Sequence, residues 1–275
     1  MGKIQKRLRP LLGTFVEIGA PAEEEQFAGA SGFAFETILK VQNLLSFHDP
    51  KSQLSKLNQS FQQEIILDPV AVVALRLGRS MTQVTGGLFD FTLADEMVHK
   101  KYLPDHGGPL VADGASVQNL KIHGCKVFLQ APLRITLDGI AKGYAVDLAV
   151  KTLKAYGLKK GYVNAGGDLR VFGDWLFPIH RRNLLDQLEF LGDFKNTSVS
   201  TSAVREMDDQ RFAGKIISRK GLHGPPQSGV FSVQAPSAWL SDALTKVVCI
   251  ASGDQAQKLV DLLGAKIIGS VGTVE

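Results

Sequence analysis

Apolar residues recur with the three-to-four-residue spacing of an amphipathic helix along several segments of the chain. The widest apolar face includes Phe27, Phe35 and Ile38. Ser52 is a typical N-cap, and Asp68 before Pro69 is typical of a helix start with proline at its first position. These signals predict helices at residues 21–47, 53–58, 69–82, 94–98, 140–156, 237–251 and 254–263.

Short segments rich in β-branched and aromatic residues lie between these helices. They predict strands at residues 11–18, 120–123, 126–129, 134–137, 162–163, 169–172, 175–179, 188–191, 198–201, 230–234 and 266–268, with a hairpin around Gly173-Asp174. Residues 100–116 and 205–229, which contain many glycines and prolines, are expected to form flexible loops. Long helices between short, antiparallel-looking strands indicate an α+β fold and argue against a doubly wound sheet.

The segment from residue 137 to residue 170 organises the chain. Gly139 and Gly143 flank the start of a predicted helix, where unpaired N–H groups and the helix dipole favour an anion, and Gly157 is a plausible C-cap. Asn164 and Asp168 enclose a Gly-Gly pair after a strand, and both residue types favour turns. An ordinary β-α-β crossover with glycine turns explains the same pattern. The segment is neither G-x-G-x-x-G nor a P-loop, which disfavours a nicotinamide enzyme.

Composition narrows the class of protein. With 275 residues and 44% apolar content, the chain can build a packed core, and 21% charged residues argue against disorder. The formal net charge of +4 suits an anionic small molecule and does not argue for nucleic acid. No apolar stretch is long enough for a membrane span, so the chain as written is expected to be soluble and cytoplasmic. A periplasmic or lipoprotein location stays open if a leader was removed.

Two cysteines, Cys125 and Cys249, lie far apart in the sequence. Their number and spacing indicate two buried thiols in a reducing compartment, because neither a disulfide framework nor a zinc site fits them.

Seven short blocks, in order, resemble motifs of the ApbE family, the FAD:protein FMN transferases. The resemblance extends from about residue 11 to residue 250. The blocks are Leu12-Gly13-Thr14, Ser52 to Asn58, Gly87 to Thr92, Thr136 to Asp147, Val163 to Arg170, Ser200 to Ala203, and Ser241 to Lys246.

This resemblance implies a single ApbE-like (T-fold-like) domain over residues 1–275. It would have two intimately packed lobes, mostly antiparallel sheets, flanking helices and a flavin cleft between the lobes. The implied activity is the Mg²⁺-dependent transfer of FMN from FAD to a threonine or serine hydroxyl of an acceptor protein, with release of AMP. Two alternatives remain: a catalytically degenerate carrier or regulatory module that only binds FAD or FMN, and an FAD pyrophosphatase.

The resemblance also implies roles for single residues. Asp242 and Lys142 would be catalytic, with Lys142 also meeting the phosphates or the flavin. The carbonyl of Gly139 and the carboxylate of Asp242 would bind Mg²⁺, together with Thr245 or Lys246. The residues expected at the FAD site are Leu12, Phe89, Asp90, Thr136, Asp138, Lys142 and Ile216.

Three segments depart from the family pattern. The family's metal-binding threonine, four residues after the aspartate, is Lys246 here, and Thr245 lies about 100° away around the helix. Because an ammonium beside a cation would be repelled, Lys246 either points away from the site or replaces part of the metal's charge. The histidine often given a role in transfer corresponds to Lys215, and the aspartate of that segment to Ser218. The first aspartate of the central motif is Thr136. A general base would need another source, and His223 and His180 are candidates by residue type alone.

Overall fold

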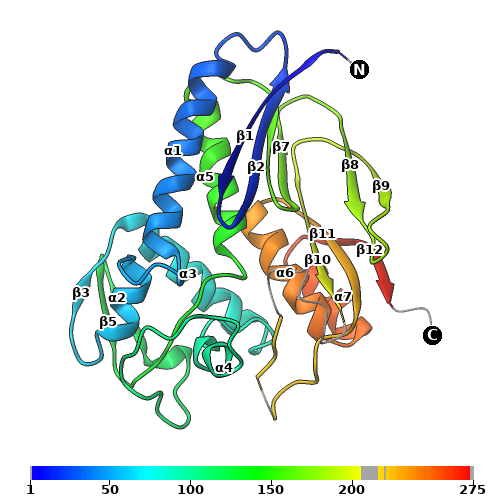
Figure 1. The fold of residues 1–275 in the computed structure, drawn as a ribbon. Helices are drawn as coiled ribbons and strands as arrows, with labels where there is room; N and C mark the ends of the chain where they lie inside the picture. Colours follow the sequence, from blue (N-terminus) through cyan, green and yellow to red (C-terminus); the bar gives the residue numbers. More distant parts are fainter. Residues whose placement is uncertain (1, 206–215, 220, 273–275) are drawn as a thin grey trace.

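A seven-stranded sheet, antiparallel throughout, is the largest element of the computed structural model, which describes residues 2–205, 216–219 and 221–272 (Figure 1). Its strands, in their order across the sheet, are β1 (Ile4–Leu11), β2 (Thr14–Pro21), β6 (Gly161–Ala165), β7 (Asp168–Phe172), β10 (Ser198–Val204), β11 (Gly229–Ala235) and β12 (Lys266–Gly272). Together with the helices, this sheet confirms the predicted α+β class.

Residues 4–21 form a hairpin, where the sequence pattern predicted one strand at 11–18. β1 pairs with β2 from Ile4 opposite Pro21 to Leu11 opposite Thr14. The turn consists of Leu12 and Gly13, both with positive φ (56° and 69°). β1 was missed because its basic side chains hide the strand pattern, although such charges are common on edge strands, where they discourage further pairing.

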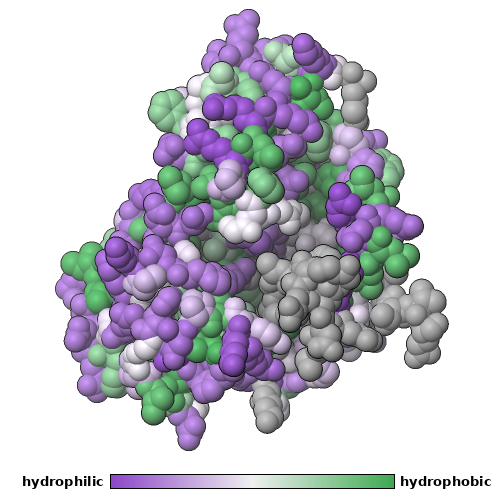
Figure 2. Space-filling view, viewed as in Figure 1, coloured by the Kyte–Doolittle hydropathy of each residue, from purple (hydrophilic) through white to green (hydrophobic). Residues whose placement is uncertain are grey.

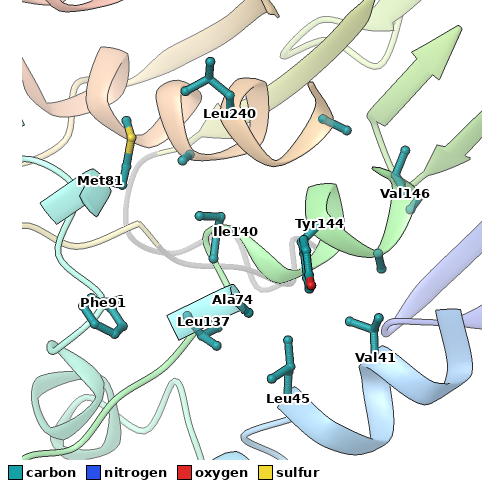
Figure 3. Close-up of a cluster of buried hydrophobic side chains, with 14 of the residues drawn as sticks. Val41, Leu45, Ala74, Met81, Phe91, Leu137, Ile140, Tyr144, Val146 and Leu240 are labelled. Carbon is teal, nitrogen blue, oxygen red and sulfur yellow. The ribbon is translucent and has the colours of Figure 1, made fainter. Parts of the chain in front are cut away.

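Three helices cover one face of the large sheet: α1 (Phe27–Leu45), α5 (Ala141–Ala155) and α6 (Ala238–Ile250) (Figure 1). α5 packs against both of the others. Figure 3 shows Ile140 and Tyr144 between Leu45 of α1 and Leu240 of α6, inside the main hydrophobic core. The helices predicted at 21–47, 140–156 and 237–251 are therefore confirmed with slightly shorter bounds, and Gly157 ends α5 with a φ of 91°.

The opposite face of the sheet is covered by a separate hairpin, β8 (Phe177–Arg182) and β9 (Leu188–Phe194). Tyr162 belongs to the small core under this hairpin, whereas its neighbour Val163 belongs to the main core, as alternation along a strand requires. The predicted hairpin of 169–172 with 175–179 is wrong. The chain leaves the large sheet at Gly173 (φ 80°), and β7 pairs with β10 rather than with the segment that directly follows it.

A second group of elements extends the main core away from the large sheet. It contains α2 (Gln53–Gln59), α3 (Pro69–Val84), α4 (Ala94–His99), a 3₁₀ turn (Val117–Asn119) and a small sheet of β3 (Ile65–Ile66), β5 (Lys126–Leu129) and β4 (Leu120–His123). The expected caps are present, since Ser52 accepts from the N–H of Ser55 and Asp68 from that of Val70. α7 (Gly253–Leu262) precedes β12 near the C-terminus.

Residues 134–137 are extended but do not form the predicted strand. The Asn58 side chain donates to the carbonyl of Ile135 and accepts from its N–H, both at 2.8 Å. The N–H of Thr136 binds the carbonyl of Phe91 at 2.9 Å. The side-chain amide of Asn58 thus takes the place of the neighbouring strand that the apolar pattern led us to expect. Its two hydrogen bonds hold the segment that leads into α5.

The predicted loop at 100–116 contains turns and irregular backbone, and that at 205–229 lies partly outside the described residues. On the face seen in Figure 2, apolar residues are interspersed with polar ones over the described surface. Within the described ranges, no helix combines the length and the apolar character that crossing a bilayer needs. Both cysteines are free; Cys249 is buried, as predicted, whereas Cys125 is only partly buried.

Candidate active site

The backbones of α5 and α6 touch at Gly143. A Cβ atom at this position would lie 2.2 Å from the carbonyl oxygen of Ala238 and 2.8 Å from the Cβ of Asp242. The sequence predicted a close backbone approach at the start of this helix. The structure identifies the approaching group as helix α6.

The anion at the start of α5 is the carboxylate of Asp242. Its Oδ2 accepts from the N–H of Gly143 at 3.0 Å, and its side chain is fully buried. Gly143 is the third residue of α5, so its N–H has no partner within the helix, and the helix dipole favours a negative charge there. Asp242 thus lies beside the segment that begins with the Gly139 turn; that the two bind one ligand, as the family resemblance implies, stays a prediction.

Lys142 joins two buried carboxylates that come from different elements. Its Nζ lies 2.7 Å from Oδ2 of Asp168, the first residue of β7, and 3.9 Å from Oδ1 of Asp242. Burial alone would lower the pKa of Lys142, but the two carboxylates outweigh it and raise that pKa. Burial, followed by the charge of Asp242, raises the pKa of Asp168. The sequence favoured a turn role for Asp168, and that interpretation missed this ion pair.

Lys246 lies one helical turn after Asp242 and binds it. Its Nζ donates to Oδ1 of Asp242 and, at 3.2 Å, to the hydroxyl of Thr245. Burial opposes the ionised form of Asp242, but Lys142, Lys246 and the Gly143 N–H together hold the pKa of this carboxyl below its usual range. Of the two orientations open from the sequence, Lys246 therefore adopts the one that faces the carboxylate.

Hydroxyl groups on β10 fix α6 in this position. The Ser241 hydroxyl lies 2.5 Å from that of Ser198 and 2.8 Å from that of Ser200, and the Thr245 hydroxyl lies 2.7 Å from that of Ser202. Every second residue of a strand shares a face, and residues four apart share a helix face, so the two rows match. Thr245 also donates to the carbonyl of Asp242 at 2.7 Å.

The N-terminus of α6 is held by Asp147, a residue for which the sequence suggested no role. Its carboxylate accepts from the N–H groups of Ala238 and Trp239, each at 2.9 Å, and pairs with Arg170. Asp147 is on α5, so the same helix positions both the start of α6 and Asp242.

Gly139 lies in the turn before α5, between an aromatic ring and the stem of Lys246. A Cβ at Gly139 would lie 3.0 Å from Cε2 of Phe89 and 3.8 Å from Cγ of Lys246. Phe89 is itself buried in the main core. The Asp138 side chain is open to solvent, yet the surrounding protein raises the pKa of its carboxyl, with His48 and Lys142 partly offsetting this.

Asp90 connects the loop before α4 to the segment 216–219. Its Oδ1 accepts from the N–H and the hydroxyl of Thr92, so it stabilises its own turn. Its Oδ2 receives both Nε (2.8 Å) and Nη2 (2.5 Å) of Arg219. The segment 221–224 follows, and Nε2 of His223 lies 3.8 Å from the Cβ position of Gly87.

The remaining predicted residues lie in different surroundings. Thr136 is buried and its hydroxyl accepts from the N–H of Asp138 at 3.3 Å. Leu12 and Ile216 pack at the edge of the main core. His180 belongs to β8 and contacts Phe190 in the outer hairpin. Lys215 falls outside the described residues.

The buried cluster of Lys142, Asp168, Asp242 and Lys246 is called the lysine–aspartate cluster below. This cluster does not fit a magnesium ion bound to Asp242. Mg²⁺ requires oxygen ligands that are free to bind it, whereas the two carboxylate oxygens of Asp242 already accept hydrogen bonds from Lys246 and from the Gly143 N–H. Over the ranges that the structure describes, no group of three or more His, Cys, Asp or Glu side chains could hold a metal ion.

Two recesses of the described surface lie away from this cluster. A cavity of about 10 Å³ is lined by Phe47, Ser55, Asn58, Gln59, His106, Gly107 and Arg134, and an open depression by Lys154, Leu158, Lys159, Gly173, Asp174, Lys195 and Asn196. Neither has the residues expected at a flavin, so the flavin cleft remains a prediction.

Comparison with known proteins adds independent information. The model of the ApbE family matches residues 12–268. An FAD:protein FMN transferase of Rhodobacter capsulatus is 26% identical over 240 residues, covering 78% of this chain and 45% of that protein. One of Klebsiella pneumoniae (strain 342) is 21% identical over 229 residues, covering 77% of this chain and 71% of that protein. The chain thus spans about half the length of the first relative.

Among solved structures, the ApbE protein of Thermotoga maritima superposes with a TM-score of 0.81 at 20% identity. The match covers 99% of this chain and 97% of that one. At this level of identity the match establishes the fold.

Proposed function

The chain belongs to the ApbE family, and from this premise we propose that it transfers FMN from FAD to a threonine or serine hydroxyl of an acceptor protein and releases AMP. Both curated relatives bear the name FAD:protein FMN transferase. The observation that supports the proposal most directly is the buried lysine–aspartate cluster at the start of α5, which brings together motif residues about a hundred positions apart.

The proposed reaction exchanges one P–O bond for another. The acceptor hydroxyl oxygen bonds to the phosphorus of the FMN half, the bond from that phosphorus to the bridging oxygen breaks, and AMP leaves with that oxygen. Such reactions depend on positioning the phosphates and neutralising their developing charge. Lys142, whose side chain is 31% exposed and whose raised pKa keeps it cationic, is suited to this task.

The proton of the acceptor hydroxyl needs a base, and His223 is our candidate. Its Nε2 is buried and has no hydrogen-bond partner among the residues that the structure describes, a costly state that a substrate group could relieve. The backbone N–H of His223 binds the carbonyl of Arg219 at 3.4 Å, and Arg219 is held by Asp90. His223 therefore has a fixed position beside the Gly87 loop. His180, in the outer hairpin, lacks this setting.

The Mg²⁺ that the resemblance implied has no assigned step here, because Lys246 already binds the carboxylate expected to hold it. We propose instead that Lys142 and His223 support the transfer.

The test is an assay of AMP release from FAD, with and without an acceptor polypeptide containing threonine or serine. AMP that forms only with acceptor, together with an acceptor mass increased by one FMN, is the expected result. Lys142→Gln should reduce AMP release strongly, whereas Lys151→Gln, on the exposed face of the same helix, should not. AMP formation independent of acceptor would make the chain an FAD pyrophosphatase.

A second candidate is a protein that binds flavin nucleotide without transferring it. The replacement of the family's histidine by Lys215 and of its metal-binding threonine by Lys246 favours this candidate. Stoichiometric FAD binding without any AMP would support it and would remove the transferase proposal.

A further inference from the structure

The position of Lys246 suggests how this chain handles the charge of a pyrophosphate. The lysine stem passes Gly139, whose Cβ position is 3.8 Å from Cγ of Lys246, and the ammonium binds Oδ1 of Asp242. These are the two residues that the family resemblance assigned to a metal ion. The ammonium therefore lies where the resemblance expects a cation.

The surroundings of Lys246 hold it there. Its partner Asp242 is fully buried, fixed on its other oxygen by the Gly143 N–H, and located on a helix tied to β10 by hydroxyl groups. The Lys246 side chain is itself 17% exposed, so it is not sealed in the core. An ammonium has three donors, and two of them bind Asp242 and Thr245, which leaves one for a further acceptor.

Resting on the function proposed above, we propose that Lys246 replaces the divalent cation in this chain and donates directly to the pyrophosphate of FAD. Charge-assisted hydrogen bonds to phosphate oxygens are strong, and lysine is a common phosphate ligand. The other ammonium of the cluster, Lys142, is partly exposed and supplies a neighbouring positive charge. FAD binding is then independent of magnesium.

The decisive measurement is the dissociation constant for FAD, by fluorescence titration, in EDTA and in excess Mg²⁺. The wild-type value should agree within about twofold between the two buffers. Lys246→Thr, which introduces the family's residue, should bind FAD about tenfold or more weakly in EDTA, as expected for a lost charge-assisted bond, and should recover in Mg²⁺. Lys151→Thr is the matched control and should behave as wild type in both buffers.

Mn²⁺ binding, followed by electron paramagnetic resonance, gives a readout that does not depend on activity. Wild type should bind no Mn²⁺ at the cluster, and Lys246→Thr should bind it. Lys246→Gln, which nearly keeps the length of the side chain but removes its charge, should lose FAD affinity without rescue by Mg²⁺. This variant provides the test if Lys246→Thr fails to fold.

Several results would overturn the inference. One is a wild-type protein that loses FAD affinity tenfold or more in EDTA; another is Mn²⁺ bound to the wild-type cluster. FAD binding that is insensitive to EDTA but gives no AMP would overturn the transferase proposal and leave this inference standing. A wild-type protein that binds no FAD in either buffer would overturn both.

Discussion

Gly143→Ala tests the crossing of α5 and α6 on which the candidate site depends. The added Cβ would lie 2.2 Å from the carbonyl oxygen of Ala238, and Cβ atoms essentially never lie closer than 3.0 Å to a heavy atom to which they are not bonded. The helices would have to separate there by at least about 0.8 Å, the difference between these two distances. The obstacle is backbone, so no side chain can rotate away to relieve it.

The magnitude follows from two destabilising effects and one stabilising effect. Overpacking of this kind costs about 1–3 kcal/mol, and weakening the hydrogen bond from Gly143 to the ionised Asp242 adds up to about 1.5–3 kcal/mol. Replacing a helical glycine by alanine returns about 0.5–1 kcal/mol. We expect a net loss of about 2–4 kcal/mol in the free energy of unfolding, measured by urea denaturation, together with weaker FAD binding.

A matched control makes the result specific. Gly29 is an exposed residue inside α1, and a Cβ there would meet nothing within 4 Å. Gly29→Ala should therefore stabilise the protein by up to about 1 kcal/mol. If Gly143→Ala were as stable as wild type and bound FAD equally well, the close contact of the two helices would be refuted.

Three further predictions follow from other parts of the structure. Asn58→Ala should lower the free energy of unfolding by about 2–4 kcal/mol in urea denaturation, because it leaves the buried N–H and carbonyl of Ile135 without partners; a loss under about 0.5 kcal/mol would contradict this. Burial raises the pKa of the Cys249 thiol to about 12, so at pH 8 a thiol reagent should modify Cys125 first and Cys249 only on unfolding. Because the neutral thiol favours the folded state, this contribution to stability should be complete below about pH 8.5 and decline above it, which denaturation at several pH values measures. His223→Asn should reduce AMP release by about a hundredfold or more while the FAD dissociation constant stays unchanged, and equal effects of His180→Asn would argue against His223 as the base.

The helices were predictable because their signals are local. Ser52, Asp68 with Pro69, and Gly157 each mark a helix end by their own chemistry, and the structure confirms all three. The strands were less predictable, because a strand exists only with a partner. Residues 134–137 look like a strand but bind the Asn58 side chain, and β1 looks polar but pairs along its whole length with β2.

The candidate site shows the same division. Lys142 and Asp242 were found because they lie in recognisable motifs, whereas Asp168 was interpreted as a turn residue. An aspartate after a Gly-Gly pair is chemically suited to a turn, and nothing nearby in sequence identifies its partner Lys142, 26 residues away. Asn164 does stabilise that turn, by accepting from the N–H of Gly167 at 3.1 Å. Residue type alone did not distinguish the turn residue Asn164 from the ion-paired Asp168, because the partner of Asp168 is brought to it only by long-range packing.

Lys246 connects the stability of the fold to the chemistry proposed for it. A fully buried carboxylate without a cation would be very costly, so Asp242 requires permanent compensation. A metal ion supplies this only while it is bound, whereas a lysine one turn along the same helix is covalently attached and close to its binding position. The family's threonine would leave Asp242 with only Lys142, at 3.9 Å, and the Gly143 N–H until a metal arrived. In this chain Lys246 compensates the charge of Asp242 without any bound ligand, and its ammonium has one donor left for a further acceptor.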